Sequence, residues 1–243
     1  MISFAYRSFG KTDTGLVRSH NEDSMLVNDQ AGLWLVFDGM GGHENGALAS
    51  QTAASAFDPF ELPTEFEEAV TSVADRIHNV NSVLAEVAHK QNISKMGTTA
   101  VGLLLRDRRF AAVWVGDSRA YIFRSGGLFQ LTVDHTHVQD LLDEGILSAA
   151  DAKDHPMSHV LTRALGVEPE VQVDIVHDEA EPNDRFLLCS DGLSGPVPED
   201  EIRQIMALPD PEQVVGELIA RAHANGAPDN VTAIVVEIGN VDP

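Results

Sequence analysis

Seven short apolar runs, separated by turns rich in Gly, Asn and Asp, constrain the fold of this chain more than any other feature. Runs of six to eight residues rich in Val, Ile, Leu and Phe predict β-strands. Short strands with turn residues between them favour stacked antiparallel sheets over a doubly wound parallel sheet. The predicted strands are residues 32–37, 98–105, 109–116, 119–124, 171–176, 184–190 and 231–238.

Helical periodicity predicts two pairs of helices along the same chain. From Pro63 to Ala88, apolar residues recur at steps of three and four, and Thr64 and Glu67 have the spacing of a capping box. The simplest packing places the helices outside the sheets, so we expect an α+β fold: a four-layer α-β-β-α sandwich of two packed antiparallel sheets flanked by helix pairs. The other helices are predicted over residues 46–57, 198–207 and 211–224.

Length and local composition predict how the chain is organised. A chain of 243 residues is expected to form one domain, residues 1–243, with its own core. Residues 134–170 carry few strand signals, several turn residues and four histidines, so this segment is predicted to cover or border a site. Cys189 is the only cysteine, which excludes an internal disulfide and a cysteine-based zinc site and predicts a buried thiol.

The charge balance narrows the classes of partner. The 38 acidic and 16 basic residues give a net charge of −22, which disfavours nucleic acid and anionic membrane surfaces. No apolar run approaches the roughly 18 residues of a membrane span. The N-terminal residues lack the pattern of a secretory signal. We therefore expect a cytoplasmic protein without nucleic-acid or membrane partners, and a monomer by default.

Aspartates occur at the ends of four predicted strands. In VFDG, VGDS and CSDG the aspartate follows an apolar strand, and in APDN it precedes one. Any one of them can be an ordinary turn former. If their strands lie side by side, however, the carboxylates converge and must take up protons or bind a cation, because like charges at close range repel. The four residues are Asp38, Asp117, Asp191 and Asp229.

The chemistry of these side chains indicates the kind of cation. Carboxylate oxygens without cysteine suit Mg²⁺ or Mn²⁺. The segment TDTGLVRSHNEDS adds Glu22 and Asp23, with Arg18 four residues before Glu22. A guanidinium beside bound metal ions is suited to holding a phosphate by two hydrogen bonds. The pattern predicts a Mg²⁺ or Mn²⁺ cofactor and phosphoryl chemistry.

Eight ordered segments between Thr12 and Ile238 resemble a known family. They are TDTGLVRSHNEDS, VFDGMGGH, MGTTAVGLLL, VGDSRAYIFR, LTVDHTHVQDLLDEG, HVLTRALG, LLCSDGLSG and DNVTAIVVEI. The chain resembles the bacterial metal-dependent serine/threonine protein phosphatases of type 2C. The resemblance implies the same sandwich fold and an enzyme of signalling, a hydrolase that removes phosphate from phosphoserine and phosphothreonine on proteins. The attacking water would be bridged between two Mn²⁺ or Mg²⁺ ions, and the substrates would be phosphorylated by a separate Ser/Thr kinase.

The resemblance also implies roles for residues of this chain. Asp38 would bridge two metal ions, the Gly39 carbonyl would bind one of them, and Asp191 and Asp229 would hold the other. Arg18 would bind the substrate phosphate, and His43 is the candidate general acid for the departing oxygen. The remaining metal positions are Asp23 and Glu22, acting directly or through water, and Asp117, which with Asp191 matches a third-metal position.

Two alternatives to this enzyme fit parts of the sequence. A catalytically silent phosphoprotein-binding module of the same fold would have lost metal ligands, and here all are present. GDSR at 116–119 resembles the start of some serine esterases, but Ser118 lies between two predicted strands instead of opening a helix. His20, His135, His137, His155 and His159 lack zinc-motif spacing and are predicted to be structural or solvated, and Arg163 is predicted to form a structural ion pair.

Overall fold

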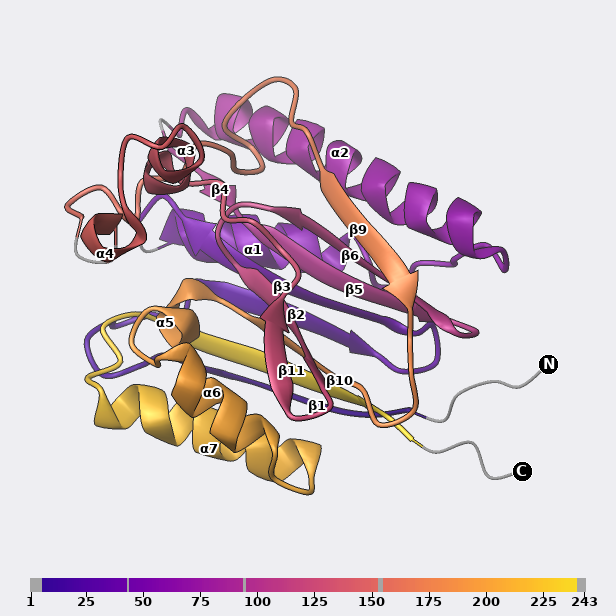
Figure 1. Ribbon diagram of the computed structural model, residues 1–243. Coiled ribbons are helices and arrows are strands. Elements are labelled where there is room, and N and C mark those ends of the chain that lie inside the picture. Colours follow the sequence, from indigo (N-terminus) through magenta and orange to yellow (C-terminus); the bar gives the residue numbers. More distant parts are fainter. Residues whose placement is uncertain (1–5, 43, 94, 153–154, 240–243) are drawn as a thin grey trace.

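The fold consists of four layers, with a pair of helices on the outer face of each of two packed antiparallel sheets (Figure 1). The computed structural model describes residues 6–42, 44–93, 95–152 and 155–239. The predicted α+β sandwich is confirmed.

The first sheet has the strand order β1-β11-β10-β7-β8. Its central strands are buried because one face packs on the other sheet and the opposite face packs on helices. The register sets Asp13 opposite Val231 and Tyr6 opposite Ile238, so both ends of β1 and β11 coincide. The strands are β1 (Tyr6–Asp13), β7 (Arg119–Arg124), β8 (Gly127–Gln130), β10 (Arg185–Cys189) and β11 (Val231–Ile238).

The second sheet has the order β2-β3-β5-β6-β9, and β4 pairs with the end of β3. Strands β2 and β3 pair in a register that sets Asp23 opposite Asp38. Two carboxylates thus lie side by side at one end of this sheet. The strands are β2 (Asp23–Asn28), β3 (Leu33–Met40), β4 (Gly97–Thr98), β5 (Ala100–Arg106), β6 (Arg109–Val115) and β9 (Asp174–Glu179).

Helices α1 and α2 cover the second sheet, and α6 and α7 cover the first (Figure 1). The capping box predicted for α2 is wrong: the helix begins at Phe66 after the N-cap residue Glu65, whose side chain makes no capping hydrogen bond. No helix among the described residues is long and apolar enough to cross a membrane. The helices are α1 (Glu44–Ser55), α2 (Phe66–Gln91), α3 (His137–Asp143), α4 (Ala149–Ala152), α5 (Asp191–Ser194), α6 (Glu199–Met206) and α7 (Pro211–Ala224).

The core has three parts, one between each two adjacent layers. Trp34 and Phe186 are buried between the sheets, where Phe186 also packs against Phe110 with ring centroids 4.9 Å apart. Strands covered on both faces read as continuous apolar runs, which is why the sequence predicted most of them. The three strands that were not predicted, β1, β2 and β8, are only partly buried. Cys189 is buried as predicted, and burial raises the pKa of its thiol to about 12.

Residues 134–170 form an irregular segment that contains α3 and α4 and lies at the same end of the sandwich as α5 (Figure 1). Isolated bridges join it to the body and to itself: Leu165 pairs with Thr98, and Leu161 with Thr136. It contributes no strand to either sheet within its described part.

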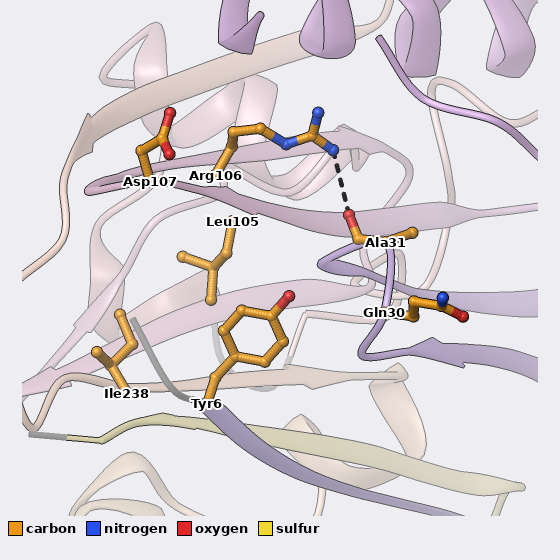
Figure 2. A pocket seen from close by; sticks show the side chains of 7 residues that line it. All are labelled: Tyr6, Gln30, Ala31, Leu105, Arg106, Asp107 and Ile238. Atoms are coloured by element: carbon orange, nitrogen blue, oxygen red, sulfur yellow. Dashed lines mark hydrogen bonds between the residues drawn. The ribbon is translucent and has the colours of Figure 1, made fainter. Parts of the chain in front are cut away.

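A hollow of about 180 Å³ lies at the other end of β1 and β11, between Tyr6 and Ile238 (Figure 2). Two of the polar side chains around it, Tyr6 and Arg106, already have hydrogen-bond partners. The Tyr6 hydroxyl donates to the Asp29 carbonyl at 2.6 Å, and Arg106 Nη2 donates to the Ala31 carbonyl at 3.3 Å. The remaining lining residues are Gln30, Leu105 and Asp107. Asp38, Asp117, Asp191 and Asp229 do not border this hollow.

Candidate active site

Asp23 joins the two sheets. Its side chain is 6% exposed, and its Oδ2 accepts hydrogen bonds from Ser190 Oγ at 2.8 Å and Thr232 Oγ1 at 2.6 Å. Both donors belong to the first sheet or its edge, whereas Asp23 begins β2 in the second. Burial raises the pKa of Asp23 to about 7, against the lowering effect of these two hydrogen bonds. Burial at the junction of the sheets therefore disfavours the charged carboxylate, and a positive charge nearby would favour it.

Asp38 lies beside Asp23 near the end of β3, and its backbone is held by Thr99. Its N–H donates to Thr99 Oγ1 at 3.1 Å, and its carbonyl accepts from the Thr99 N–H at 2.8 Å. Burial raises its pKa well above the usual range, and the charges of the other aspartates add to this shift. In order of effect, these are Asp23, Asp191, Asp117 and Asp229.

Asp117 and Asp191 enter the same cluster from two further segments. Asp117 lies in the turn between β6 and β7, is 8% exposed, and has its pKa raised to about 8 by burial and by the charges of Asp191 and Asp134. Asp191 is the first residue of α5. Burial and then Asp229 raise its pKa, while a hydrogen bond with Asp38 opposes the shift.

Asp229 and Arg18 form the solvent-facing side of the cluster. Arg18 Nη2 donates to Asp229 Oδ2 at 2.6 Å, and this hydrogen bond raises the pKa of the guanidinium. About half of the Arg18 side chain is exposed. The pair leaves part of the guanidinium open to an incoming anion, next to the buried carboxylates.

Glu22 lies against the start of α1 in space provided by glycine. A Cβ at Gly46 would overlap Glu22 Oε2, and it would also lie 2.9 Å from the Gly39 carbonyl oxygen. The Glu22 carboxylate and the Gly39 carbonyl therefore approach the same point. A Cβ at Gly39 would overlap the carbonyl oxygens of Gly46 and Glu22. Only glycine fits at either position.

Gly46→Ala should displace the Glu22 carboxylate from this point. We expect a weaker response to divalent cations than in the wild type, measured as the Mn²⁺ concentration that gives half of the maximal phosphatase rate. Gly216→Ala, in the exposed middle of α7 with open space around it, is the matched control. It should raise stability by about 0.5–1 kcal/mol without changing the Mn²⁺ response. An unchanged response in Gly46→Ala would exclude a role for the Glu22 position.

The donor chemistry fits divalent cations. Buried carboxylates that raise one another's pKa are stabilised by a positive charge between them, and oxygen ligands suit Mg²⁺ and Mn²⁺. Across the described residues, no three acidic, histidine or cysteine side chains are grouped closely enough to hold an ion on their own. The Gly39 carbonyl oxygen, which approaches the same point as the Glu22 carboxylate, is a further oxygen that could complete a set.

The structure brings together the predicted residues Arg18, Glu22, Asp23, Asp38, Gly39, Asp117, Asp191 and Asp229. His43 lies outside the described residues. His159 Nδ1 lies 3.8 Å from Asp191 Oδ2, although its side chain is largely exposed. Arg163 pairs with Asp174 at 3.1 Å, as predicted.

Sequence reasoning missed Asn230, which positions the segment that carries Arg18 and Glu22. The buried Asn230 side chain accepts from the Glu22 N–H at 2.8 Å and donates to the carbonyls of Thr14 and His20, both at 2.9 Å. The available signal was its place between Asp229 and an apolar strand, where a buried amide needs partners.

Comparisons with known proteins show which family this chain resembles. The family model described as protein phosphatase 2C matches residues 17–234. The serine/threonine protein phosphatase PstP of Mycobacterium tuberculosis is 36% identical over 99% of this chain, which spans only 46% of PstP. The serine/threonine phosphatase Stp of Listeria welshimeri is 37% identical, with 93% of this chain and 94% of Stp covered.

Solved structures extend the match to three dimensions. A crystal structure of PstP has a TM-score of 0.91 at 36% identity, with 97% of this chain and 99% of that chain covered. The catalytic domain of PstP in complex with two manganese ions has a TM-score of 0.86 at 35% identity, with 98% and 100% covered. The fold, the ordered motifs and the family model lead to one conclusion: the chain belongs to the protein phosphatase 2C family.

Proposed function

We propose that this chain hydrolyses phosphoserine and phosphothreonine esters of proteins in a reaction that requires divalent metal ions. The observation that carries the proposal is the cluster of buried and partly exposed aspartates that raise one another's pKa beside a half-exposed arginine. Such a cluster attracts cations, and the arginine provides an anion-binding group at its edge. The relatives are named serine/threonine phosphatases, which supports the same reaction class.

The carboxylates would hold the metal ions. Asp38 and the Gly39 carbonyl, with Asp191 and Asp229, would form the site for two Mn²⁺ or Mg²⁺ ions, and PstP binds two manganese ions. When bound, these ions supply Lewis acidity that neutralises phosphate charge and makes water a better nucleophile. The other proposed positions are Glu22 and Asp23, and Asp117 with Asp191 for a third ion.

The chain's own residues organise the rest of the site. Arg18 would orient the phosphate, since its guanidinium is fixed on one side by Asp229. Asn230 holds the backbone around Arg18 and Glu22, which limits the movement of both side chains. Thr99 would keep Asp38 in register with its neighbours.

The serine-esterase alternative is not supported by the position of Ser118. Its hydroxyl is buried and lies 2.7 Å from Thr99 Oγ1, so it bonds to another hydroxyl. A nucleophilic serine needs a histidine base within hydrogen-bond reach, and no histidine among the described residues has a hydrogen bond to Ser118 Oγ. The silent-module alternative is opposed by the full set of acidic residues.

The experiment that tests the proposal measures phosphate release from a phosphothreonine peptide with increasing Mn²⁺ and then with excess chelator. We expect activity to require Mn²⁺ or Mg²⁺ and to vanish with chelator, because the site offers only hard oxygen ligands. Full activity in the presence of chelator would overturn the proposal.

Arg18→Ala should mainly raise the KM for a phosphorylated peptide. The lost hydrogen bonds join two charged groups already paired in the ground state, so they contribute largely uniform binding. A loss of about 1.5–3 kcal/mol corresponds to at least about a tenfold increase in KM. Arg7→Ala, at a surface pair with Glu237 distant from the site, is the control. A collapsed kcat with unchanged KM would instead assign Arg18 to the transition state.

We further propose that residues 1–243 form one catalytic domain and that residues 134–170 border the substrate site. The separate Ser/Thr kinase, the monomeric state and the cytoplasmic location are sequence-based proposals. The relatives, which are named serine/threonine phosphatases, support phosphorylated proteins as the substrates.

A further inference from the structure

We propose that His135 is a positioning residue. It fixes the turn of residues 116–118, which carries Asp117, and it connects this turn to residues 162–163. The inference rests on the proposed function, because it gives Asp117 a role in metal binding. It concerns a histidine that the sequence pattern marked only as structural or solvated.

The first observation is a two-point contact between His135 and Gly116. The Gly116 N–H donates to His135 Nδ1 at 3.0 Å, and the His135 N–H donates to the Gly116 carbonyl at 3.0 Å. His135 is 5% exposed, so water competes little for either bond. One residue thus satisfies both backbone groups of the residue that precedes Asp117.

The second observation is that the turn is held equally firmly on its other side. Gly116 has a φ of +109°, and a Cβ there would lie 2.6 Å from the Thr99 side chain. Ser118 Oγ lies 2.7 Å from Thr99 Oγ1, which also accepts the Asp38 N–H. The turn therefore fills the space between Thr99 and His135, and a shift of His135 would move Asp117 relative to Asp38.

The third observation concerns the other ring nitrogen. Because Nδ1 accepts a hydrogen bond, the neutral ring carries its proton on Nε2, which lies 3.2 Å from Asp174 Oδ2 and donates to it. Burial and then the charge of Arg163 lower the pKa of His135, which favours the neutral ring. Arg163 Nη1 donates to Asp174 Oδ1 at 3.1 Å and lies 3.3 Å from Nε2.

The backbone continues this connection. The Thr162 N–H donates to the His135 carbonyl at 2.9 Å, and Arg163 follows directly. On its face, the imidazole stacks on Trp114, with ring centroids 6.1 Å apart and planes 20° apart. His135 thus contacts four parts of the chain at once: Trp114 of β6, the turn that carries Asp117, the start of β9, and residues 162–163.

The two functions of the ring can be separated by two conservative substitutions. In asparagine, Oδ1 is bonded to Cγ, as Nδ1 is in histidine, so His135→Asn keeps an acceptor for the Gly116 N–H. In glutamine, the amide lies one carbon further out, so His135→Gln keeps a polar group near Asp174 and loses that acceptor. His177→Gln, on the exposed side of β9, is the matched control.

The experiment measures Mn²⁺ binding to the full chain by titration calorimetry, and thermal unfolding in chelator shows that each variant is folded. We expect His135→Gln to weaken the weakest Mn²⁺ site about tenfold, the lower end of the effect of losing a residue that orients a metal ligand. His135→Asn should bind Mn²⁺ more tightly than His135→Gln, and His177→Gln should match the wild type.

A double-mutant cycle with Asp117→Asn distinguishes positioning from a general structural effect. If His135 acts through Asp117, His135→Gln should cause no further loss of Mn²⁺ affinity in the Asp117→Asn background. Two outcomes would overturn the inference, provided that the wild type binds Mn²⁺. One is an equal loss of Mn²⁺ affinity in His135→Asn and His135→Gln. The other is a loss from His135→Gln that is as large in the Asp117→Asn background as in the wild type. A wild-type chain that binds no Mn²⁺ and is inactive would overturn the proposed function as well.

Discussion

Asp38→Ala should reduce kcat/KM for a phosphothreonine peptide about 100-fold or more, a loss of about 2.7 kcal/mol of transition-state stabilisation. Asp38 is the residue whose pKa is raised by all four other aspartates of the cluster. A carboxylate in that central position would contact two cations, so its loss removes a ligand from both. The measurement is the initial rate at saturating Mn²⁺, and a loss smaller than about tenfold would exclude the bridging role.

Asp38→Asn supplies the control for folding, because we expect it to lower activity and to raise stability. A variant that lost activity by misfolding would lose both. The pKa of Asp38 is raised in the folded chain, so without metal the folded state binds more protons than the unfolded state and loses stability as the pH rises. The loss begins near the ordinary carboxyl pKa of about 4 and continues to the folded values, about 7 for Asp23 and about 8 for Asp117.

At pH 8 in chelator, Asp38→Asn should therefore unfold at a higher temperature than the wild type, since it removes one buried charge from the cluster. A variant that is more stable and inactive would show that Asp38 is retained for function at the expense of stability. If Asp38→Asn were instead less stable at pH 8 and lost activity, misfolding would account for the loss.

The layers of the fold could be predicted because most strands are covered on both faces. Strand β11 is buried along nearly its whole length, and its boundaries, Val231 to Ile238, match those predicted. Strand β1 lies at a sheet edge with partly exposed residues, and its mixed sequence YRSFGKTD gives no clear period. Apolar runs report burial, so they miss the edge strands β1, β2 and β8, whereas the edge strand β9 was predicted in part, over residues 171–176.

The proposed metal ligands could be predicted in part, because some of them lie directly beside apolar strands. Asp38 and Asp229 are recognisable because apolar strands end or begin beside them. The hydrogen bonds that Ser190 and Thr232 donate to Asp23 join residues 167 and 209 positions apart in the sequence. They depend on how the two sheets pack. No local pattern contains that information, and the same holds for the contact between His135 and Gly116.

His43→Ala should slow hydrolysis of a phosphothreonine peptide far more than hydrolysis of p-nitrophenyl phosphate. His43 lies outside the described residues, and the prediction rests on its sequence position between the end of β3 and the start of α1. A threonine alkoxide is a poor leaving group and must be protonated as it departs, so a positioned acid contributes about 10² to 10⁴ in rate. Nitrophenolate leaves without that proton. The measurement is kcat for both substrates at saturating Mn²⁺.

The ratio of the two losses separates an acid from a structural histidine. If His43 only supports the glycine turn at 41–42, its removal should disturb the nearby Asp38 and Gly39 and slow both substrates alike. Rates across about pH 5 to 9, roughly two units on either side of an ordinary histidine pKa, add a second readout, because the loss of a general acid should change the pH dependence for the peptide alone. His78→Ala, on the exposed side of α2, should leave both rates and both pH profiles as in the wild type. Equal losses on the two substrates with an unchanged profile would remove His43 from proton transfer and leave the carboxylate cluster as the site of metal binding.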